Sequence, residues 1–169
     1  MFFAAARAAS EPIHHCLDWF GASQAVARQW LKAGYSAVSF DIKLNHEHDM
    51  VSESGCKNLL TIAAQLHSHA AVICAPPCSL FSPACASVHQ RNWFRPEGNP
   101  TVFLVRLAQQ ILHNFATLLR VILSAAPTLS VIVEQPSGSW CYKQWFMEIL
   151  IEDFDLLPVG QSLYIGWDN

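Results

Sequence analysis

The sequence predicts an α/β fold built on a mostly parallel sheet. Short apolar segments of strand length alternate with segments whose apolar residues repeat at the spacing of a helix. The strand-like segments end abruptly, at Gly21, Asp41, Pro76 and Glu134. This alternation is typical of strands joined by right-handed helical crossovers, which make neighbouring strands parallel.

The first half of the chain begins with residues 1–12, which we expect to form an N-terminal tail. Ser23 can cap the first helix and Gly34 can end it, because these residue types favour those two positions. The polar segment 43–54 is expected to be a loop with solvated histidines. The expected elements are a strand at 13–20, a helix at 24–32, a strand at 35–40, a helix at 57–67 and a strand that ends at Pro76.

The second half begins with a long irregular segment, residues 79–100, which contains three prolines. Loops of this length inside a domain are usually functional or disordered. The elements expected after it are a helix at 101–124, a strand at 129–133, a helix at 142–151 and a last strand at 162–165. The complete order predicts a single domain, residues 13–169, with a Rossmann-like three-layer sandwich whose sheet is shortened at the C-terminus.

Composition limits the classes of function. The chain has 169 residues, 52% of them hydrophobic, and a net charge of −3, which argues against strong stand-alone binding to nucleic acid. Its six cysteines are not spaced like a disulfide framework, and no stretch of 18 uncharged apolar residues predicts a membrane span. We therefore expect an intracellular protein, cytoplasmic or nuclear, with reduced thiols. The start lacks acidic residues before Glu11, which leaves import into an organelle open.

Polar or reactive residues follow the first four predicted strands. They are Asp18 to Gly21, Asp41, Pro76 to Cys78, and Glu134 to Pro136. Carboxyl ends of parallel strands meet at one edge of a sheet, and ligands of such folds bind there, near the point where the strand order reverses. The thiol of Cys78, placed on a rigid Pro-Pro turn, is the strongest single lead at this edge.

Asp41 stands 20 residues after Gly21. An acidic residue at about this distance from a strand–glycine–helix turn accepts hydrogen bonds from the hydroxyls of a ribose. The turn at Gly21 lacks the additional glycines that cradle a pyrophosphate. The spacing therefore favours a small adenosine cofactor without a phosphate.

These segments together resemble the cytosine-5 DNA methyltransferases. The resemblance covers residues 13–140 and is closest to short, divergent members of that family. It is carried, in the family's order, by Leu17-Asp18-Trp19-Phe20-Gly21-Ala22-Ser23, Asp41, Asp49-Met50, Pro76-Pro77-Cys78-Ser79 and Glu134-Gln135-Pro136. It implies a class I methyltransferase fold that binds S-adenosylmethionine and takes part in DNA methylation.

The resemblance also implies a role for each motif residue. Phe20, Gly21 and Ser23 would line the methionine end of the cofactor, Asp41 would hold the ribose, and Asp49 would face the adenine amino group. Asp18 and Pro76 belong to the same motifs and are included among the cofactor-binding residues. Cys78 would be the nucleophile that attacks carbon 6 of cytosine, and Glu134 would bind the ring nitrogen and the exocyclic amine.

The sequence also departs from the family pattern. Ala22, Ser79 and Gln135-Pro136 stand where the family usually has glycine, glutamine and Asn-Val. No region for recognising the target sequence follows Glu134, so DNA binding is expected to be weak without a partner protein. These departures favour an alternative function, a catalytically inactive methyltransferase-like binding domain.

Two further interpretations use the residues around Cys78. A methyltransferase that acts on amines would carry an acceptor side chain before the two prolines, where this chain has Ala75. A zinc module could use Cys74, Cys78, Cys85 and His89 as four soft ligands. If Cys78 is a nucleophile, Arg91 and Arg95 are the candidate cations for lowering the pKa of its thiol.

Overall fold

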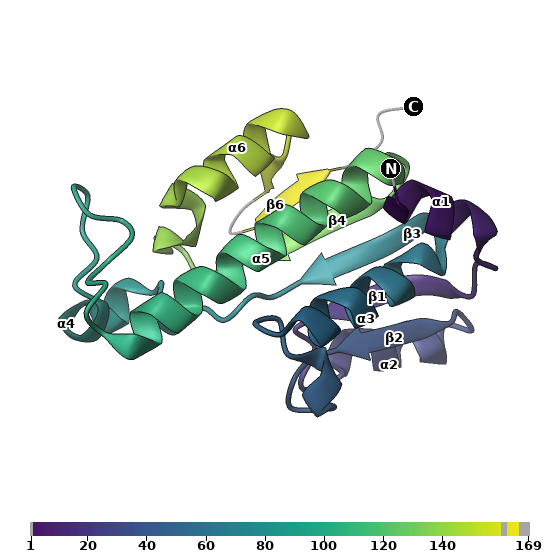
Figure 1. Ribbon diagram of the computed structural model, residues 1–169, viewed down its shortest axis with the longest axis horizontal. Coiled ribbons are helices and arrows are strands. Elements are labelled where there is room, and N and C mark those ends of the chain that lie inside the picture. Colours follow the sequence, from purple (N-terminus) through teal and green to yellow (C-terminus); the bar gives the residue numbers. More distant parts are fainter. Residues whose placement is uncertain (1, 160–161, 166–169) are drawn as a thin grey trace.

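The computed structural model describes residues 2–159 and 162–165 and contains one six-stranded sheet (Figure 1). Its strand order is β2-β1-β3-β4-β6-β5, and the first four of these strands are parallel. β6 runs antiparallel to both β4 and β5. The strands are β1 (His14–Trp19), β2 (Ala37–Phe40), β3 (Leu66–Cys74), β4 (Ser130–Glu134), β5 (Leu157–Val159) and β6 (Ser162–Ile165).

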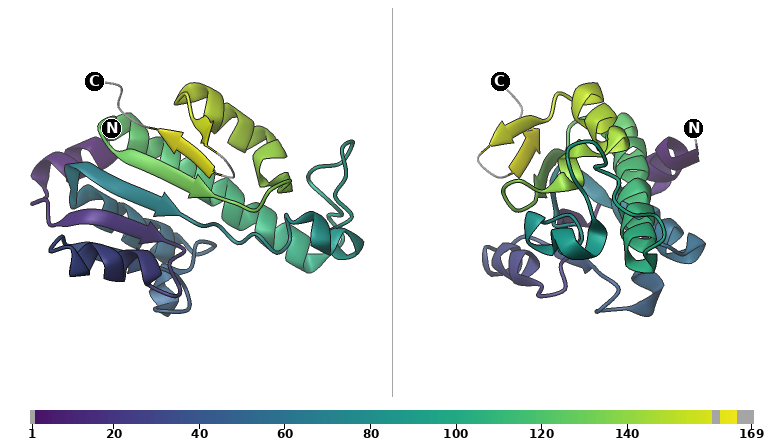
Figure 2. Two further views of the ribbon diagram at one scale, coloured as in Figure 1. Left: turned by 180° about the vertical axis from the view of Figure 1, so that it is seen from behind. Right: turned by 90° about the vertical axis from the view of Figure 1, so that its left-hand side faces the viewer.

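Helices cover both faces of the sheet, so the predicted Rossmann-like three-layer sandwich is confirmed. α2 packs on β1 and β2, whereas α1, α3, α5 and α6 contact one another on the opposite face (Figure 2). The α-helices are α1 (Phe2–Ala9), α2 (Ala25–Lys32), α3 (Glu53–Ala64), α4 (Ala86–His89), α5 (Phe103–Ala125) and α6 (Trp145–Asp153). Short 3-10 turns are η1 (His46–His48), η2 (Pro83–Cys85) and η3 (Trp140–Lys143).

The carboxyl ends of the four parallel strands are level with one another. Trp19 of β1 aligns with Phe40 of β2 and with Cys74 of β3, and Cys74 aligns with Val133 of β4. All four side chains are completely buried. The strand ends are therefore anchored in the core, and the segments that leave them emerge along a single edge of the sheet.

α5 is the longest helix and carries much of the core. Its residues Phe115, Leu119 and Ile122 have no exposed surface, because they lie against the sheet. The sequence predicted this helix within two residues at each end. No helix in the described part of the chain is both long and apolar enough to cross a membrane.

The N-terminal segment differs from the tail that we expected. α1 places Phe3 in the core, with 9% of its surface exposed. Arg7 donates hydrogen bonds to the carbonyl oxygens of Ala63, at 3.1 Å, and His67, at 3.4 Å. This helix therefore joins the layer formed by α3 and α5.

The segment 79–100 is organised around the buried side chain of Arg91. The Arg91 Nε donates to the Leu80 carbonyl at 2.8 Å, and its Nη1 donates to the Pro96 carbonyl at 2.6 Å. The guanidinium also lies 4.3 Å from the centre of the Phe81 ring. These contacts fix the two ends of the segment to each other, beyond the carboxyl end of β3 (Figure 1).

Candidate functional site

The strand order reverses between β1 and β3. From β1 the chain crosses to β2 on one side, and from β2 it returns past β1 to β3 on the other side. The helices on either side of such a point diverge and leave a crevice at the carboxyl edge. A cavity of about 320 Å³, here called the switch-point cavity, lies there, within the size range of small-molecule sites. It is lined by Phe20, Ala22, Asp41, Ile42, Lys43, His48, Asp49, Met50, Ala75, Pro77 and Ile111.

Phe20 forms one wall of this cavity. Its backbone has a φ of 66°, a left-handed conformation that turns the chain sharply as it leaves β1. Its ring packs 5.7 Å from the ring of Trp19 and 5.8 Å from the ring of Phe115. The core residues Trp19 and Phe115 therefore fix the Phe20 ring in place as a preformed apolar wall.

Asp18 lies beneath the turn and does not line the cavity. Its Oδ2 accepts hydrogen bonds from the Ala27 backbone and from the Ser39 hydroxyl, both at 3.3 Å, and only 5% of the residue is exposed. A Cβ on Gly21 would come closer than 3.0 Å to this carboxylate. Asp18 and Gly21 thus shape the connection from β1 to α2. Ser23 is exposed, and its hydroxyl accepts from the Ala25 backbone at 3.3 Å.

Two carboxylates, of Asp41 and Asp49, line the cavity. The Asp41 Oδ1 accepts from the Lys43 backbone at 2.8 Å, and the Asp49 Oδ1 accepts from the Val51 backbone at 2.9 Å. These bonds hold each carboxylate in place and use only part of its capacity, because a carboxylate has about four acceptor positions. The structure therefore brings together Asp41 and Asp49, the two acidic residues that the sequence assigned to a ribose and an adenine.

His48 is a cavity residue that the sequence analysis missed. Its ring stacks on Phe40, with centroids 4.2 Å apart, and its Nδ1 lies 3.4 Å from the backbone nitrogen of Asp41. Burial lowers the pKa of His48, although the neighbouring Asp41 and Glu47 act in the opposite direction. A neutral ring that accepts at Nδ1 carries its hydrogen on Nε2. The only sequence signal was its position next to Asp49 in a polar loop.

The Pro-Pro turn forms another wall of the cavity. Ala75 and Pro77 face the cavity, whereas Pro76 is buried between them. The Pro76 carbonyl accepts from the side-chain amide of Gln135 at 2.6 Å, and the Gln135 Oε1 accepts from the Ser139 hydroxyl at 2.9 Å. Pro76 therefore positions this wall through its backbone rather than by lining it.

Cys78 and Glu134 are both exposed at the same edge of the sheet. The Cys78 carbonyl accepts from the backbones of Phe81 and Ser82, both at 2.9 Å, so the thiol follows the Pro-Pro turn at the start of a second tight turn. Glu134 is the last residue of β4, and the register of β3 and β4 places it beside the exit from β3. Neither side chain lines the switch-point cavity itself.

The surroundings of Cys78 include a second thiol. Burial raises the pKa of Cys141, the nearby charge of Arg91 opposes this rise, and Cys78 adds to it. Burial lowers the pKa of Arg91 to about 10. The Arg91 guanidinium binds the Leu80 and Pro96 carbonyls and the Phe81 ring and so holds the loop in shape, whereas its Nη2 is buried without a hydrogen bond.

The four candidate zinc ligands are not gathered into a site. Cys74 is completely buried in β3, and burial raises the pKa of its thiol. Both ring nitrogens of His89 are engaged, Nε2 with the Ser82 carbonyl at 2.8 Å and Nδ1 with the Arg91 backbone at 2.9 Å. Within residues 2–159 and 162–165, no group of three or more His, Cys, Asp or Glu side chains could hold a metal ion.

Comparisons with protein-family models, with curated proteins and with solved structures found no match to this chain. The fold and the geometry of the site are therefore the basis for proposing a function.

Proposed function

We propose that this protein binds S-adenosylmethionine in the switch-point cavity, as a methyltransferase of the cytosine-5 type. The observation that carries the proposal is the pairing of Asp41 and Asp49 around one cavity with apolar walls. Asp41 offers a carboxylate to the ribose hydroxyls, and Asp49 offers one to an exocyclic amine. Phe20, Met50 and Pro77 supply flat apolar surface for a purine.

The polar groups that line the cavity fit a nucleoside better than a nucleotide. The acidic side chains at the cavity are acceptors, and they would repel a phosphate. Lys43 is the single Lys or Arg among the lining residues of this described cavity. An adenosine with a sulfonium carries no phosphate and has a positive charge, which suits the two carboxylates.

When bound, S-adenosylmethionine supplies an activated methyl group. In the proposed reaction, Cys78 adds to carbon 6 of a cytosine, and Glu134 stabilises the charge that develops on the ring. Both side chains emerge on the edge that holds the cavity, from neighbouring strands. DNA is the proposed substrate, and weak binding to DNA without a partner protein follows from the net charge of −3.

The alternative is a methyltransferase-like domain that binds the cofactor without chemistry. One observation favours it. Neither Cys78 nor Glu134, the two residues of the proposed chemistry, lines the cavity that would hold the cofactor. Both versions of the proposal share the cofactor cavity. They differ only in whether Cys78 and Glu134, at the carboxyl edge of the sheet, react with a cytosine.

Calorimetric titration with S-adenosylhomocysteine tests the shared part. The chain should bind this product, and Asp41→Ala should weaken binding by about 1–3 kcal/mol through lost hydrogen bonds to the ribose. Asp18→Asn is the matched control, because Asp18 lies under the turn and not in the cavity. Absence of heat and of any thermal shift with the unaltered chain at millimolar ligand contradicts the proposal.

A further inference from the structure

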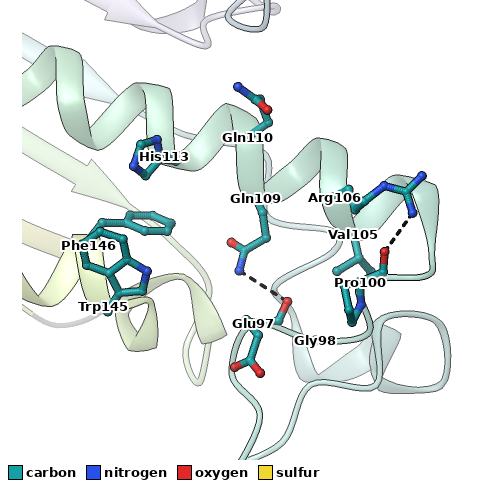
Figure 3. A pocket seen from close by; sticks show the side chains of 10 residues that line it. All are labelled: Glu97, Gly98, Pro100, Val105, Arg106, Gln109, Gln110, His113, Trp145 and Phe146. Carbon is teal, nitrogen blue, oxygen red and sulfur yellow. Dashed lines mark hydrogen bonds between the residues drawn. The ribbon is translucent and has the colours of Figure 1, made fainter.

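A second cavity, of about 400 Å³, lies between α5, α6 and the segment 97–100 (Figure 3). It shares no lining residue with the switch-point cavity. One side is formed by aromatic rings: Trp145 and Phe146 lie 5.4 Å apart at 79°, and His113 contacts Phe146 edge-on at 5.2 Å. Trp145 is 64% exposed, so a large aromatic face is open to a ligand.

A chain of amides fixes the polar side of this cavity. The Gln144 Nε2 donates to the carbonyls of Pro96 and Trp140, both at 2.8 Å, and this pair of acceptors determines which end of the amide is nitrogen. The Gln144 Oε1 therefore faces Gln109, whose Nε2 donates to it at 2.8 Å and to the Glu97 carbonyl at 3.4 Å.

The amide oxygen of Gln109 is left as a buried acceptor without a hydrogen bond. Figure 3 shows this oxygen on the side of Gln109 that faces Phe146 and Trp145. An unpaired buried acceptor is unfavourable, so a ligand that brings a donor gains more than an ordinary hydrogen bond. The oxygen has almost no accessible surface, so the ligand must displace a neighbouring side chain slightly.

The charges at the rim do not select an ion. The Arg106 Nη1 donates to the carbonyls of Pro100, at 2.8 Å, and Thr101, at 3.2 Å. The Glu97 carboxylate lies 3.9 Å from the Arg95 Nε. Among the lining residues, Arg106 and Glu97 thus carry opposite charges, and each has a partner. What remains unpaired is an amide acceptor beside aromatic faces.

We propose that this cavity holds a neutral, flat nitrogen heterocycle with an exocyclic amine, the chemistry of a cytosine or adenine base. The ring stacks on Trp145, and the amine donates to the Gln109 oxygen. Such a base is presented either by a free nucleoside or by a single strand of nucleic acid. This inference does not depend on the cofactor proposal, because it concerns a different cavity.

Titration with cytidine, followed by the chemical shift of the Trp145 indole, tests the site. We expect saturable, millimolar binding. Trp145→Leu removes the stacking and Gln109→Leu removes the hydrogen bond, so each should weaken binding about tenfold. N4,N4-dimethylcytidine lacks the donor. Its affinity for the unaltered chain should therefore equal the affinity of cytidine for the Gln109→Leu variant. Gln29→Leu is the matched control, because Gln29 is an exposed residue of α2 and does not line this cavity. In Trp145→Leu, binding is followed by calorimetry.

A short deoxycytidine oligonucleotide distinguishes the two sources. Tighter binding of the oligonucleotide than of cytidine supports a base within a strand, and the reverse order supports a free nucleoside. The proposal is overturned if cytidine does not saturate the shift, if the dimethylated nucleoside binds equally well, or if Gln29→Leu weakens binding as much as Gln109→Leu. Loss of cytidine binding in Asp41→Ala, with retention in Trp145→Leu, would place the ligand in the switch-point cavity and also overturn it.

Discussion

The side-chain amide of Gln135 donates to the carbonyl of Pro76 at 2.6 Å and so joins the exits of β4 and β3. Gln135 is 1% exposed, and its oxygen accepts from the Ser139 hydroxyl at 2.9 Å. The Pro-Pro turn cannot donate hydrogen bonds of its own, because proline lacks a backbone N–H. Gln135 therefore determines where the wall of the switch-point cavity lies and where the chain continues to Cys78.

Gln135→Leu tests this relationship. The change leaves the buried Pro76 carbonyl without a donor and the O–H of Ser139 without its acceptor, so we expect the free energy of unfolding to fall by about 1–3 kcal/mol. Urea denaturation measures it. Gln110→Leu removes an exposed amide of the same type and should change stability by less than about 0.5 kcal/mol. Equal effects of the two substitutions would show that the hydrogen bond from the Gln135 amide to the Pro76 carbonyl does not contribute to stability.

Gly21→Ala tests the contact between the first turn and Asp18. The new Cβ would lie closer than 3.0 Å to the Asp18 carboxylate, which is held by Ala27 and Ser39. We expect a loss of about 1–3 kcal/mol from this overpacking, measured by thermal unfolding. Asp18→Ala should restore part of the loss in the double variant, because it removes the clashing group. Additive losses in the two single variants and the double variant would contradict the contact.

Much of the site edge could be predicted from the sequence. Asp41 and the Pro76–Cys78 turn follow short apolar segments, and the carboxyl ends of parallel strands must meet at one edge. The resemblance assigned Asp18 to the cofactor, whereas capping of a helix or turn, the other role that an Asp at this position can have, agrees with its bond to the first turn of α2. Its carboxylate points to α2 and not to the cavity.

Other features depend on contacts between distant segments. Arg91 lies in a proline-rich segment that resembles a solvated loop, and only the positions of Leu80 and Pro96 make it a buried anchor. α1 is stabilised by packing against α3 and α5, which no local pattern reveals. β5 was missed because it has three residues and contains Pro158, which sequence patterns assign to loops.

Stability should depend on pH through His48. Burial holds the pKa of His48 below its ordinary value of 6.5, so the unfolded chain binds a proton first as the pH falls. The contribution of His48 to stability should therefore be constant above pH 6.5 and decrease below it, down to the pKa of the folded state. His14 has a pKa lowered in the same direction, so His48→Gln should reduce the slope without abolishing it. Urea denaturation across this range, with the exposed His46→Gln as control, measures the slope.

The six cysteines should differ in reactivity. Burial raises the pKa of Cys16 to about 12 and also raises the pKa values of Cys56, Cys74 and Cys141. A raised pKa leaves less thiolate, which is the reactive form. Cys78 is the exposed thiol, so limited alkylation followed by mass spectrometry should modify it first. Earlier modification of Cys16 or Cys74 would contradict the strand-end placement of Cys78.

Methylation of ordinary duplex DNA by this chain alone should be very slow. Its net charge of −3 gives no overall attraction to the phosphate backbone, which supplies most non-specific affinity for DNA. Trapping on DNA that contains 5-fluorocytosine, in the presence of S-adenosylmethionine, is more sensitive than a methylation assay because the covalent adduct accumulates.

If the protein acts on cytosine, Cys78→Ser should abolish the adduct. Glu134→Gln should slow its formation and leave binding of S-adenosylhomocysteine unchanged, because Glu134 lies outside the cavity. An adduct that persists in Cys78→Ser refutes the nucleophile, whereas cofactor binding without any adduct in the unaltered chain identifies the inactive binding domain.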